Sequence, residues 1–344
     1  MLQREDLLGI APTPLPNRRP DRYIGEDGGI PLEALHPDDL EGLRALYRAM
    51  EDLYGRWLET RPPTGGSEGT SQAEARRRAE IAEQIRAFGD PPLSTFADAL
   101  GDRTRSDADV PWNVRRAIHD LRGGALFALR LYGGLPAEEL ANDPETLLSS
   151  VFLARDQAKM IRNILPRLDP EGRARDESEK EHAIADVLEK WDGFRLPGRD
   201  DGEGVRVRSE FFGALASCCL EASTIDRILF NLLNNALRFG EGHPVSLQVL
   251  PVEGGALRWV VSNALTDDHF QWLKTEVSEG GAGVFRAGLT RGGEGTGLAS
   301  CAEFIASAFG LGGADEALTH GYVGARWVPG RFDARFHWPL MEVA

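Results

Sequence analysis

The sequence predicts an α+β protein: a mainly helical N-terminal region, then a helical hairpin, then a layer of helices on a mixed β-sheet. Apolar residues recur at helical spacing along the first half of the 344-residue chain. Short alternating runs typical of strands follow, and a charged segment at residues 170–180 separates the two patterns. We therefore expect a mainly helical region at residues 1–110, a hairpin at residues 111–170 and an α/β sandwich at residues 181–342.

The composition fits a folded protein and excludes several function classes. Apolar residues make up 42% of the chain, which supplies a sizeable core and excludes wholesale disorder. The net charge of -15 repels phosphate backbones and argues against nucleic-acid binding, although a local basic patch remains compatible with it. No stretch approaches the roughly 18 consecutive apolar residues of a membrane span, and the start of the chain does not resemble a signal peptide. We expect a cytoplasmic protein without membrane insertion.

The N-terminal region opens with a segment rich in proline, glycine and charge at residues 1–30, which predicts an extended arm. Apolar residues at helical spacing then predict a helix over residues 37–60. A loop at residues 61–72 precedes a charged helix over residues 73–88, and residues 91–109 are expected to be irregular or to form short helices.

The hairpin region carries two apolar seams with heptad-type spacing. The seam residues follow one another at intervals of three and four: Val114, Ile118, Leu121, Ala125, Ala128 and Tyr132, then Leu147, Val151, Ala154, Ala158, Ile161 and Leu165. One such hairpin has too little core, so two copies in a dimeric four-helix bundle would complete it. The alternative is a bundle within one chain, in which the helices at residues 37–88 are the partners.

Beyond residue 180 the pattern becomes a mixture of helices and strands. A short helix is expected over residues 182–191 and a strongly apolar helix over residues 224–239. The expected strands cover residues 205–211, 214–220, 245–251, 257–262 and 323–340, the last range holding two. A glycine-rich tract at residues 280–297 leads into a helix of small residues over residues 298–309.

The apolar helix carries an unusual row of amides. Asn231 and Asn235 are four residues apart and share one face, with Asn234 beside them and Arg238 three residues further on. Amide oxygens are suitable ligands for Mg²⁺, which keeps substrate phosphates among its other ligands, and a guanidinium can meet a phosphate oxygen. An ordinary half-buried helix is the competing interpretation, but asparagine is a poor helix former, so three in five positions need an explanation.

The glycine-rich tract supplies a second feature suited to phosphate. Gly292, Gly293, Gly295 and Gly297 permit positive φ angles and a close backbone approach. Their N–H groups and the N-terminus of the helix that begins at Leu298 can bind phosphate oxygens. The tract lies about sixty residues after the asparagine helix, with two strands and a short helix expected between them.

These two segments resemble known motifs. NLLNNALR resembles the N box of the GHKL ATPase superfamily, and GEGTGLAS resembles its second glycine box. Residues 181–342 are therefore similar to the catalytic ATP-binding domain of two-component sensor histidine kinases. The resemblance implies that ATP and Mg²⁺ are bound, with Asn231 and Asn235 on the metal. It further implies ATP contacts for Asn234, Arg238, Gly293, Gly295, Thr296, Gly297 and Leu298, and a lid at residues 280–294 with Phe285, Thr290 and Arg291.

The first seam contains AIHDLRGGAL, which resembles the H box of the same kinases. The resemblance implies that His119 is the phosphoacceptor and that Asp120 bonds to its imidazole or takes its proton. Arg122 is expected either to neutralise phosphate charge or to pair with Asp120. Gly123 and Gly124 follow directly, and two glycines weaken a helix enough to permit a bend beside the histidine.

The first glycine box departs from the pattern of this family. Asn263 stands where an aspartate usually reads the adenine amino group, and the following glycines are absent. We expect a homodimeric kinase that phosphorylates His119 and passes the phosphoryl group to a response-regulator aspartate. Two alternatives stay open: a phosphotransferase or adaptor that no longer uses ATP, and a GHKL ATPase without histidine phosphorylation.

Overall fold

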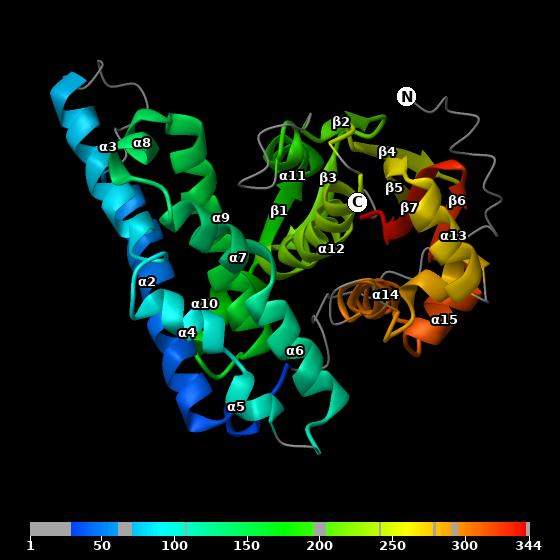
Figure 1. Ribbon diagram of the computed structural model, residues 1–344, viewed down its shortest axis with the longest axis horizontal. Helices are drawn as coiled ribbons and strands as arrows, with labels where there is room; N and C mark the ends of the chain where they lie inside the picture. Colours follow the sequence, from blue (N-terminus) through cyan, green and yellow to red (C-terminus); the bar gives the residue numbers. More distant parts are fainter. Residues whose placement is uncertain are drawn as a thin grey trace. The chain divides into compact units, whose positions relative to one another are not determined.

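The computed structural model describes residues 29–60, 71–106, 109–195, 204–240, 242–277, 280–289, 291 and 295–341 (Figure 1). Residues 1–28 of the arm expected at residues 1–30, most of the loop at residues 61–72, and Thr290, Gly292 and Gly293 of the glycine tract lie outside these residues. The described residues divide after Arg175 into two compact units. We name them the helical unit, Gly28–Arg175, and the sheet unit, Asp176–Ala344.

The helical unit is built from helices alone among its described residues. They are η1 (Leu32–Ala34), α2 (Pro37–Thr60), α3 (Ser71–Arg86), α4 (Leu93–Ala99), α5 (Asp102–Arg105), α6 (Trp112–Arg122), α7 (Gly124–Gly133), α8 (Ala137–Asn142) and α9 (Pro144–Ile164). The charged segment at residues 170–180 was expected to be a linker, and this prediction is wrong. It forms helix α10 (Pro170–Glu177), which leads directly into a strand. No described helix combines the length and apolar character that a membrane span requires.

The two heptad seams are buried within this one chain. Their residues share a core with Leu43, Leu46 and Met50 of α2 and with Ile81 and Ile85 of α3. The intrachain alternative therefore accounts for the seams, because α2 and α3 supply the apolar surface that a single hairpin lacks. A homodimer, if it forms, must use other residues of the hairpin.

The first helix of the hairpin is interrupted after the H-box residues. Gly123 has an extended backbone, with φ -81° and ψ -163°, so α6 ends at Arg122 and a new helix begins at once. The expected bend beside His119 is confirmed. Gln157 of α9 stabilises the break, because its Nε2 donates to the carbonyl oxygen of Leu121 at 3.0 Å.

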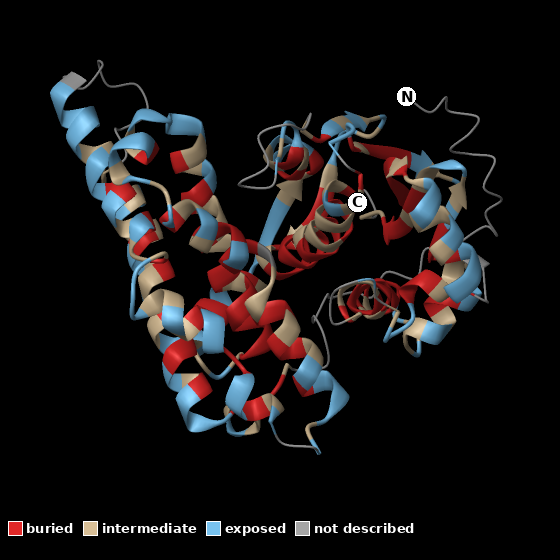
Figure 2. Cartoon of the chain, in the orientation of Figure 1, coloured by how far each residue is buried: buried red, intermediate tan, exposed pale blue. Residues whose placement is uncertain are grey.

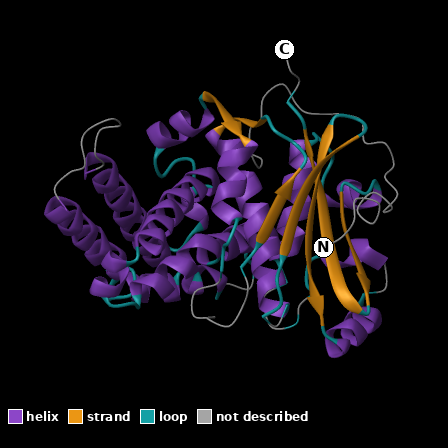
Figure 3. Cartoon of the chain, turned by 90° about the horizontal axis from the view of Figure 1, so that it is seen from above, coloured by secondary structure: helices purple, strands orange, loops and turns teal. Residues whose placement is uncertain are grey.

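The sheet unit places helices on a mixed five-stranded sheet (Figure 3). Its helices are α11 (Ile184–Trp191), α12 (Cys219–Phe239), α13 (Asp267–Glu276), η2 (Gly280–Phe285), α14 (Gly297–Ala308) and α15 (Ala314–Thr319). Its strands are β1 (Glu179–Ala183), β2 (Arg206–Ser209), β3 (Ala214–Cys218), β4 (Ser246–Val252), β5 (Ala256–Leu265), β6 (Val323–Val328) and β7 (Gly330–Pro339). The large sheet has the order β2-β4-β5-β7-β6 with only β2 and β4 parallel, while β1 and β3 form a separate antiparallel pair.

The core of the sheet unit lies between this sheet and two helices. Trp259 of β5 stacks on Phe336 of β7 with 5.5 Å between ring centroids, and both are fully buried. The neighbouring Trp338 donates its Nε1 hydrogen to Glu221 of α12, which identifies the face of the sheet that α12 covers. The short helix expected between the strands and the glycine-rich tract is α13, whereas α15 was not expected from the sequence. The α+β class itself is confirmed.

Candidate functional site

The amide row on α12 forms one border of the candidate site. Its helix buries Ile228, Leu229, Leu232, Leu233 and Ala236 in the core. Asn231, Asn234 and Asn235 are only half-buried, and their side chains form no hydrogen bond with any residue that the structure describes. Half-buried amides without protein partners are available to a ligand.

Helix α14 packs against α12, the helix that carries this row. The guanidinium of Arg227 sits 4.1 Å from the ring of Phe304, and the Sγ of Cys301 lies 3.9 Å from the carbonyl oxygen of Ile228. A later residue of α12 therefore contacts an earlier residue of α14. These two contacts show that α12 and α14 pack against each other around Ile228 and Cys301.

The backbone at the start of α14 allows another group to come close to it. Gly295 has φ +68°, and a Cβ there would come within 3.0 Å of the backbone of Gly288, whose N–H donates to the Gly295 carbonyl at 3.1 Å. The side chain of Thr296, the residue that precedes the helix, does not cap it. Thr296 is 6% exposed, and its buried hydroxyl has no hydrogen-bond partner in the described structure. Uncapped N–H groups and a free hydroxyl at a helix N-terminus suit an anion.

Asn263 lies at the other end of the amide row. It is 6% exposed, on β5, and a Cβ at Gly240, directly after α12, would lie 3.6 Å from its Cβ. Its Nδ2 donates to the carbonyl of Ala264 at 2.6 Å, which leaves Oδ1 as an acceptor without a partner among the described residues. The end of α12 therefore lies beside Asn263 of β5.

The two expected cations are placed differently. Arg291 pairs with the carboxylate of Asp268 on α13, so that carboxylate balances its charge. Arg238 is exposed at the end of α12, with its guanidinium 5.3 Å from the ring of Phe239. Phe285 of the expected lid is fully buried in the core, so this part of the lid is anchored.

Helix α13 adds residues that the sequence reasoning missed. His269 packs edge-on against Phe239, 4.8 Å away, and burial together with the nearby Arg291 lowers the pKa of its imidazole. A signal for this helix was present: the Thr266 hydroxyl accepts from the His269 N–H as an N-cap, and two aspartates follow in the first turn.

The second candidate site, in the helical unit, surrounds His119. Its Nδ1 lies 3.2 Å from Oδ1 of Asp120; the side chain of His119 is 25% exposed and that of Asp120 only 4%. The buried carboxylate thus orients a half-buried imidazole through Nδ1, and Nε2 is left as the nitrogen able to act as a nucleophile.

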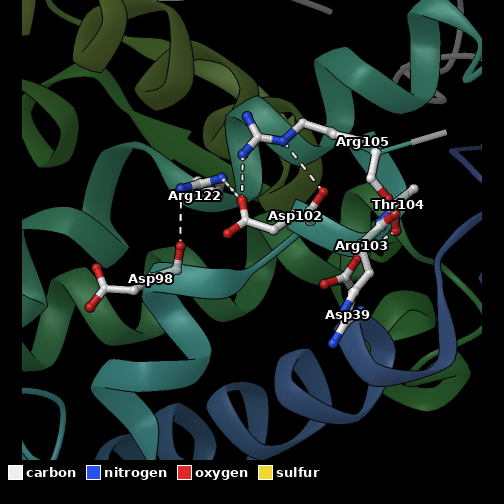
Figure 4. A network of polar contacts seen from close by, with 9 residues as sticks. Asp39, Asp98, Asp102, Arg103, Thr104, Arg105 and Arg122 are labelled. Atoms are coloured by element: carbon white, nitrogen blue, oxygen red, sulfur yellow. Dashed lines mark hydrogen bonds and ion pairs between the residues drawn. The ribbon is translucent and has the colours of Figure 1, made fainter. Parts of the chain in front are cut away.

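Arg122 does not pair with Asp120, one of the two roles expected for it. Its Nη1 donates to Oδ1 of Asp102 at 2.8 Å and its Nη2 to the carbonyl of Asp98 at 3.0 Å (Figure 4). Arg105 donates to the same Asp102 oxygen at 2.8 Å. The turn between α4 and α5 also presses on α6, because a Cβ at Gly101 would lie 2.1 Å from Cγ2 of Ile118. Arg122 therefore ties the H-box helix to α4 and α5.

No cluster of histidine, cysteine or acidic side chains suited to a metal ion exists among the described residues. The amide row is the remaining donor set. Its unpartnered oxygens fit Mg²⁺ only when phosphate oxygens complete the coordination.

Comparison with known proteins gives structural likeness alone. No protein-family model matches the chain, and no curated protein matches its sequence. A mycobacterial sensor histidine kinase, MprB, matches with 16% identity and a TM-score of 0.32, covering 48% of this chain and all of that one. The histidine kinase AdeS of Acinetobacter baumannii matches with 14% identity and a TM-score of 0.26, covering 65% of this chain and 95% of that one.

Full-length ShkA, whose structure holds AMPPNP, matches with 17% identity and a TM-score of 0.32 over 80% of this chain. The match spans 47% of the ShkA chain, so this protein corresponds to about half of that one. The two relatives whose descriptions state an activity are histidine kinases. At these TM-scores the functional argument rests on the residues of the chain.

Proposed function

We propose that this protein is a histidine kinase that binds Mg-ATP between α12 and the start of α14, phosphorylates His119 and passes the phosphoryl group to a response-regulator aspartate. The observation that carries the proposal is a set of polar side chains on α12 and at the start of α14 that have no hydrogen-bond partner among the described residues. They are the three half-buried amides of α12 and the buried hydroxyl of Thr296, which directly precedes α14. Such atoms are costly to bury unless a ligand meets them.

Each element has a role toward the nucleotide. Asn231 and Asn235 would hold the metal, with Asn234 beside them, and Asn263 Oδ1 would accept from the adenine amino group. Gly295, Thr296, Gly297 and Leu298 would bind phosphate oxygens through their N–H groups. Arg238 and Arg291 would meet phosphate oxygens, and Thr290 and Gly293 are assigned to the same loop as Arg291. Mg²⁺ would neutralise phosphate charge during transfer, and catalysis would rest on positioning.

The chemistry at His119 balances with the residues present. The lone pair of Nε2 attacks the γ-phosphorus, a P–N bond forms, and the bond to the β,γ-bridging oxygen breaks to release ADP. Asp120 accepts the Nδ1 hydrogen bond and stabilises the positive charge that develops on the imidazole. The phosphoryl group then moves from Nε2 to a carboxylate oxygen of the response regulator, and neutral imidazole is regenerated.

The hairpin would also form the homodimer. Phe127 is 48% exposed and Leu131 is 37% exposed, one turn apart on α7. Large apolar side chains at this spacing on an outer helix face are suited to a second copy of the hairpin. This surface differs from the heptad seam, which the chain fills with its own helices.

The decisive experiment incubates purified protein with ATP that is radiolabelled at the γ-phosphate. We expect acid-labile label on the wild type and none on His119→Ala, which keeps ATP binding because His119 lies in the helical unit. Binding without label would favour the GHKL ATPase alternative if steady hydrolysis accompanies it.

Asn263 favours one rival function. Its amide replaces the carboxylate expected at the adenine position, which motivates a phosphotransferase or adaptor that no longer uses ATP. That alternative predicts no ATP binding by calorimetry, together with phosphorylation of His119 by a phosphorylated receiver domain.

A further inference from the structure

Two short helices of the helical unit, α4 and α5, contact both α2 and the H-box helix α6. On the α2 side, a Cβ at Gly42 would lie only 3.1 Å from Cδ1 of Phe96 on α4. On the α6 side, no larger residue fits at Gly101, because its φ is +80° and a Cβ would lie 2.1 Å from Cγ2 of Ile118. We call residues 93–105, which hold α4, the turn at Gly101 and α5, the strut.

The contact between the strut and the start of α2 is buried and hydrogen-bonded. Buried and exposed residues alternate along α2 in Figure 2, and Asp39, 5% exposed, is one of the buried ones. Its Oδ2 accepts from the N–H of Thr104 at 2.7 Å and from the Thr104 hydroxyl at 2.6 Å (Figure 4). Thr104 is 6% exposed, and its hydroxyl oxygen accepts from the N–H of His36 at 2.9 Å. Because a buried carboxylate that loses its donors is costly, the strut is held firmly to α2.

The contacts between the strut and α6 flank His119. Ile118 directly precedes His119 and packs against the turn at Gly101. Arg122 follows His119 by one helical turn and donates to Asp102, whose side chain is 55% exposed. An exposed ion pair contributes little by itself, so it does not hold α6 rigidly. The strut therefore meets α6 just before and just after His119, through one packing contact and one exposed ion pair.

Asp98 of the strut also joins α6 to α7 across the helix break. Its carbonyl oxygen accepts from Nη2 of Arg122 at 3.0 Å, and its carboxylate forms an ion pair with Arg130 of α7. Between these two arginines, the extended backbone of Gly123 interrupts the helix. A break at a glycine lets the two helices differ in direction, so contacts that span it determine how the last turn of α6 lies.

We propose that Asp39 and Thr104 are positioning residues for His119: they fix the strut to α2, and the strut sets the turn of α6 that presents the imidazole. This inference rests on the proposed phosphorylation of His119 and adds a control on its rate. A displacement of the strut from the start of α2 misplaces the imidazole and leaves the ATP site of the sheet unit unchanged. It therefore changes the rate of phosphorylation and not the affinity for ATP.

Autophosphorylation kinetics of the full-length protein test the proposal through Thr104→Val. Valine keeps the size of the side chain and removes its hydrogen bond to Asp39. We expect the rate of His119 labelling to fall about tenfold with KM for ATP unchanged, because a misplacement of about 1 Å can cost up to about a hundredfold. Thr104→Ser retains a hydroxyl and should keep the rate near that of the wild type.

Thr146→Val is the matched control. Thr146 likewise donates its N–H and its hydroxyl to one aspartate, Asp143, at 3.1 and 2.7 Å, but it lies at the start of α9. That position is about 16 Å along α9 from Gln157, the residue that contacts α6. The same substitution there removes the same kind of bond far from His119, so labelling should change less than about twofold. Equal labelling rates in the two valine variants would overturn the proposal.

Hydrogen exchange of the α6 amides tests the proposal without ATP. In Thr104→Val, residues 112–122 should exchange about two- to tenfold faster than in Thr146→Val, the effect of one lost hydrogen bond. If the wild type takes no label, the proposed function fails and this measurement alone decides the positioning role. Equal exchange in the two variants overturns that role. If Thr104→Val does not fold, Asp39→Asn replaces it in both measurements, with changes in the same direction.

Discussion

The two candidate regions differ in how their polar groups are satisfied. Around His119, the catalytic-type residues already have partners: Asp120 meets the imidazole, and Arg122 meets Asp102 and the Asp98 carbonyl. Around α12 and α14, the amides and the Thr296 hydroxyl have none among the described residues. The difference teaches that the polar groups of the helical unit are preorganised by one another, whereas those of the sheet unit stay available to a ligand.

The largest expected effect follows from removing the preorganised carboxylate. Asp120→Asn should slow labelling of His119 by about 10²- to 10⁴-fold, the range for a lost acid–base group. ATP affinity should stay unchanged, because Asp120 belongs to the helical unit. Rapid-quench labelling and calorimetry on the same sample measure both quantities; a labelling rate within a few-fold of wild type would contradict the role of Asp120.

For the amide row we expect a substitution to weaken ATP binding without lowering the stability of the protein. Asn235→Ala should weaken ATP binding by about tenfold or more, as loss of a ligand to a charged group does. The melting temperature should stay level or rise, since alanine is the better helix former and no protein hydrogen bond is lost. A clear drop in melting temperature would show that Asn235 is structural.

Gln157→Ala is the matched control in the helical unit. Its amide is fully buried and donates to Leu121, so its removal should destabilise the protein by about 1–3 kcal/mol. ATP affinity should not change. Equal losses of stability in Gln157→Ala and Asn235→Ala would contradict the proposed difference between the two units.

The contrast follows from what the sequence could and could not specify. The spacing of Asn231 and Asn235 and the glycines before α14 were enough to propose a site at α12 and α14, because each signal is local to one element. The partners of Arg122 were not predictable, since Asp102 and Asp98 lie on short helices of low periodicity. The filling of the heptad seam by α2 also depends on tertiary packing, which periodicity alone leaves undecided between one chain and two.

Acidification should lower the folding stability of the sheet unit at a higher pH than that of the helical unit. Burial lowers the pKa of His337 from 6.5 to about 3, so the unfolded chain binds a proton below pH 6.5 that the folded sheet unit does not. Stability should therefore be full above pH 6.5 and fall on acidification at up to about 1.4 kcal/mol per pH unit. His269, also lowered by burial, acts in the same direction.

In the helical unit the hydrogen bonds from Thr146 lower the pKa of Asp143 below 3.8, so its contribution persists above pH 3.8 and is lost only as the pH falls further. Urea unfolding between pH 7 and 4, followed by tryptophan fluorescence, measures the slope. His337→Gln should flatten it; an unchanged slope would assign the effect elsewhere.

The smallest effect is expected at Arg122. Its ion pair is partly exposed, so Arg122→Ala should cost about 1 kcal/mol of stability. Labelling of His119 should fall less than tenfold, about as much as in Arg105→Ala, which loses the same Asp102 partner. A hundredfold loss confined to Arg122→Ala would instead assign Arg122 to the phosphate.

The central claim is that the polar side chains of α12 and of the start of α14 form a Mg-ATP site. Calorimetric titration of the full-length protein with ATP, in Mg²⁺ and then in excess chelator, tests it most directly. The account predicts saturable binding with Mg²⁺, at least about tenfold weaker binding without it, and none for Asn231→Ala with Asn235→Ala. Absence of binding by the wild type, or equal binding by the double variant, would contradict it.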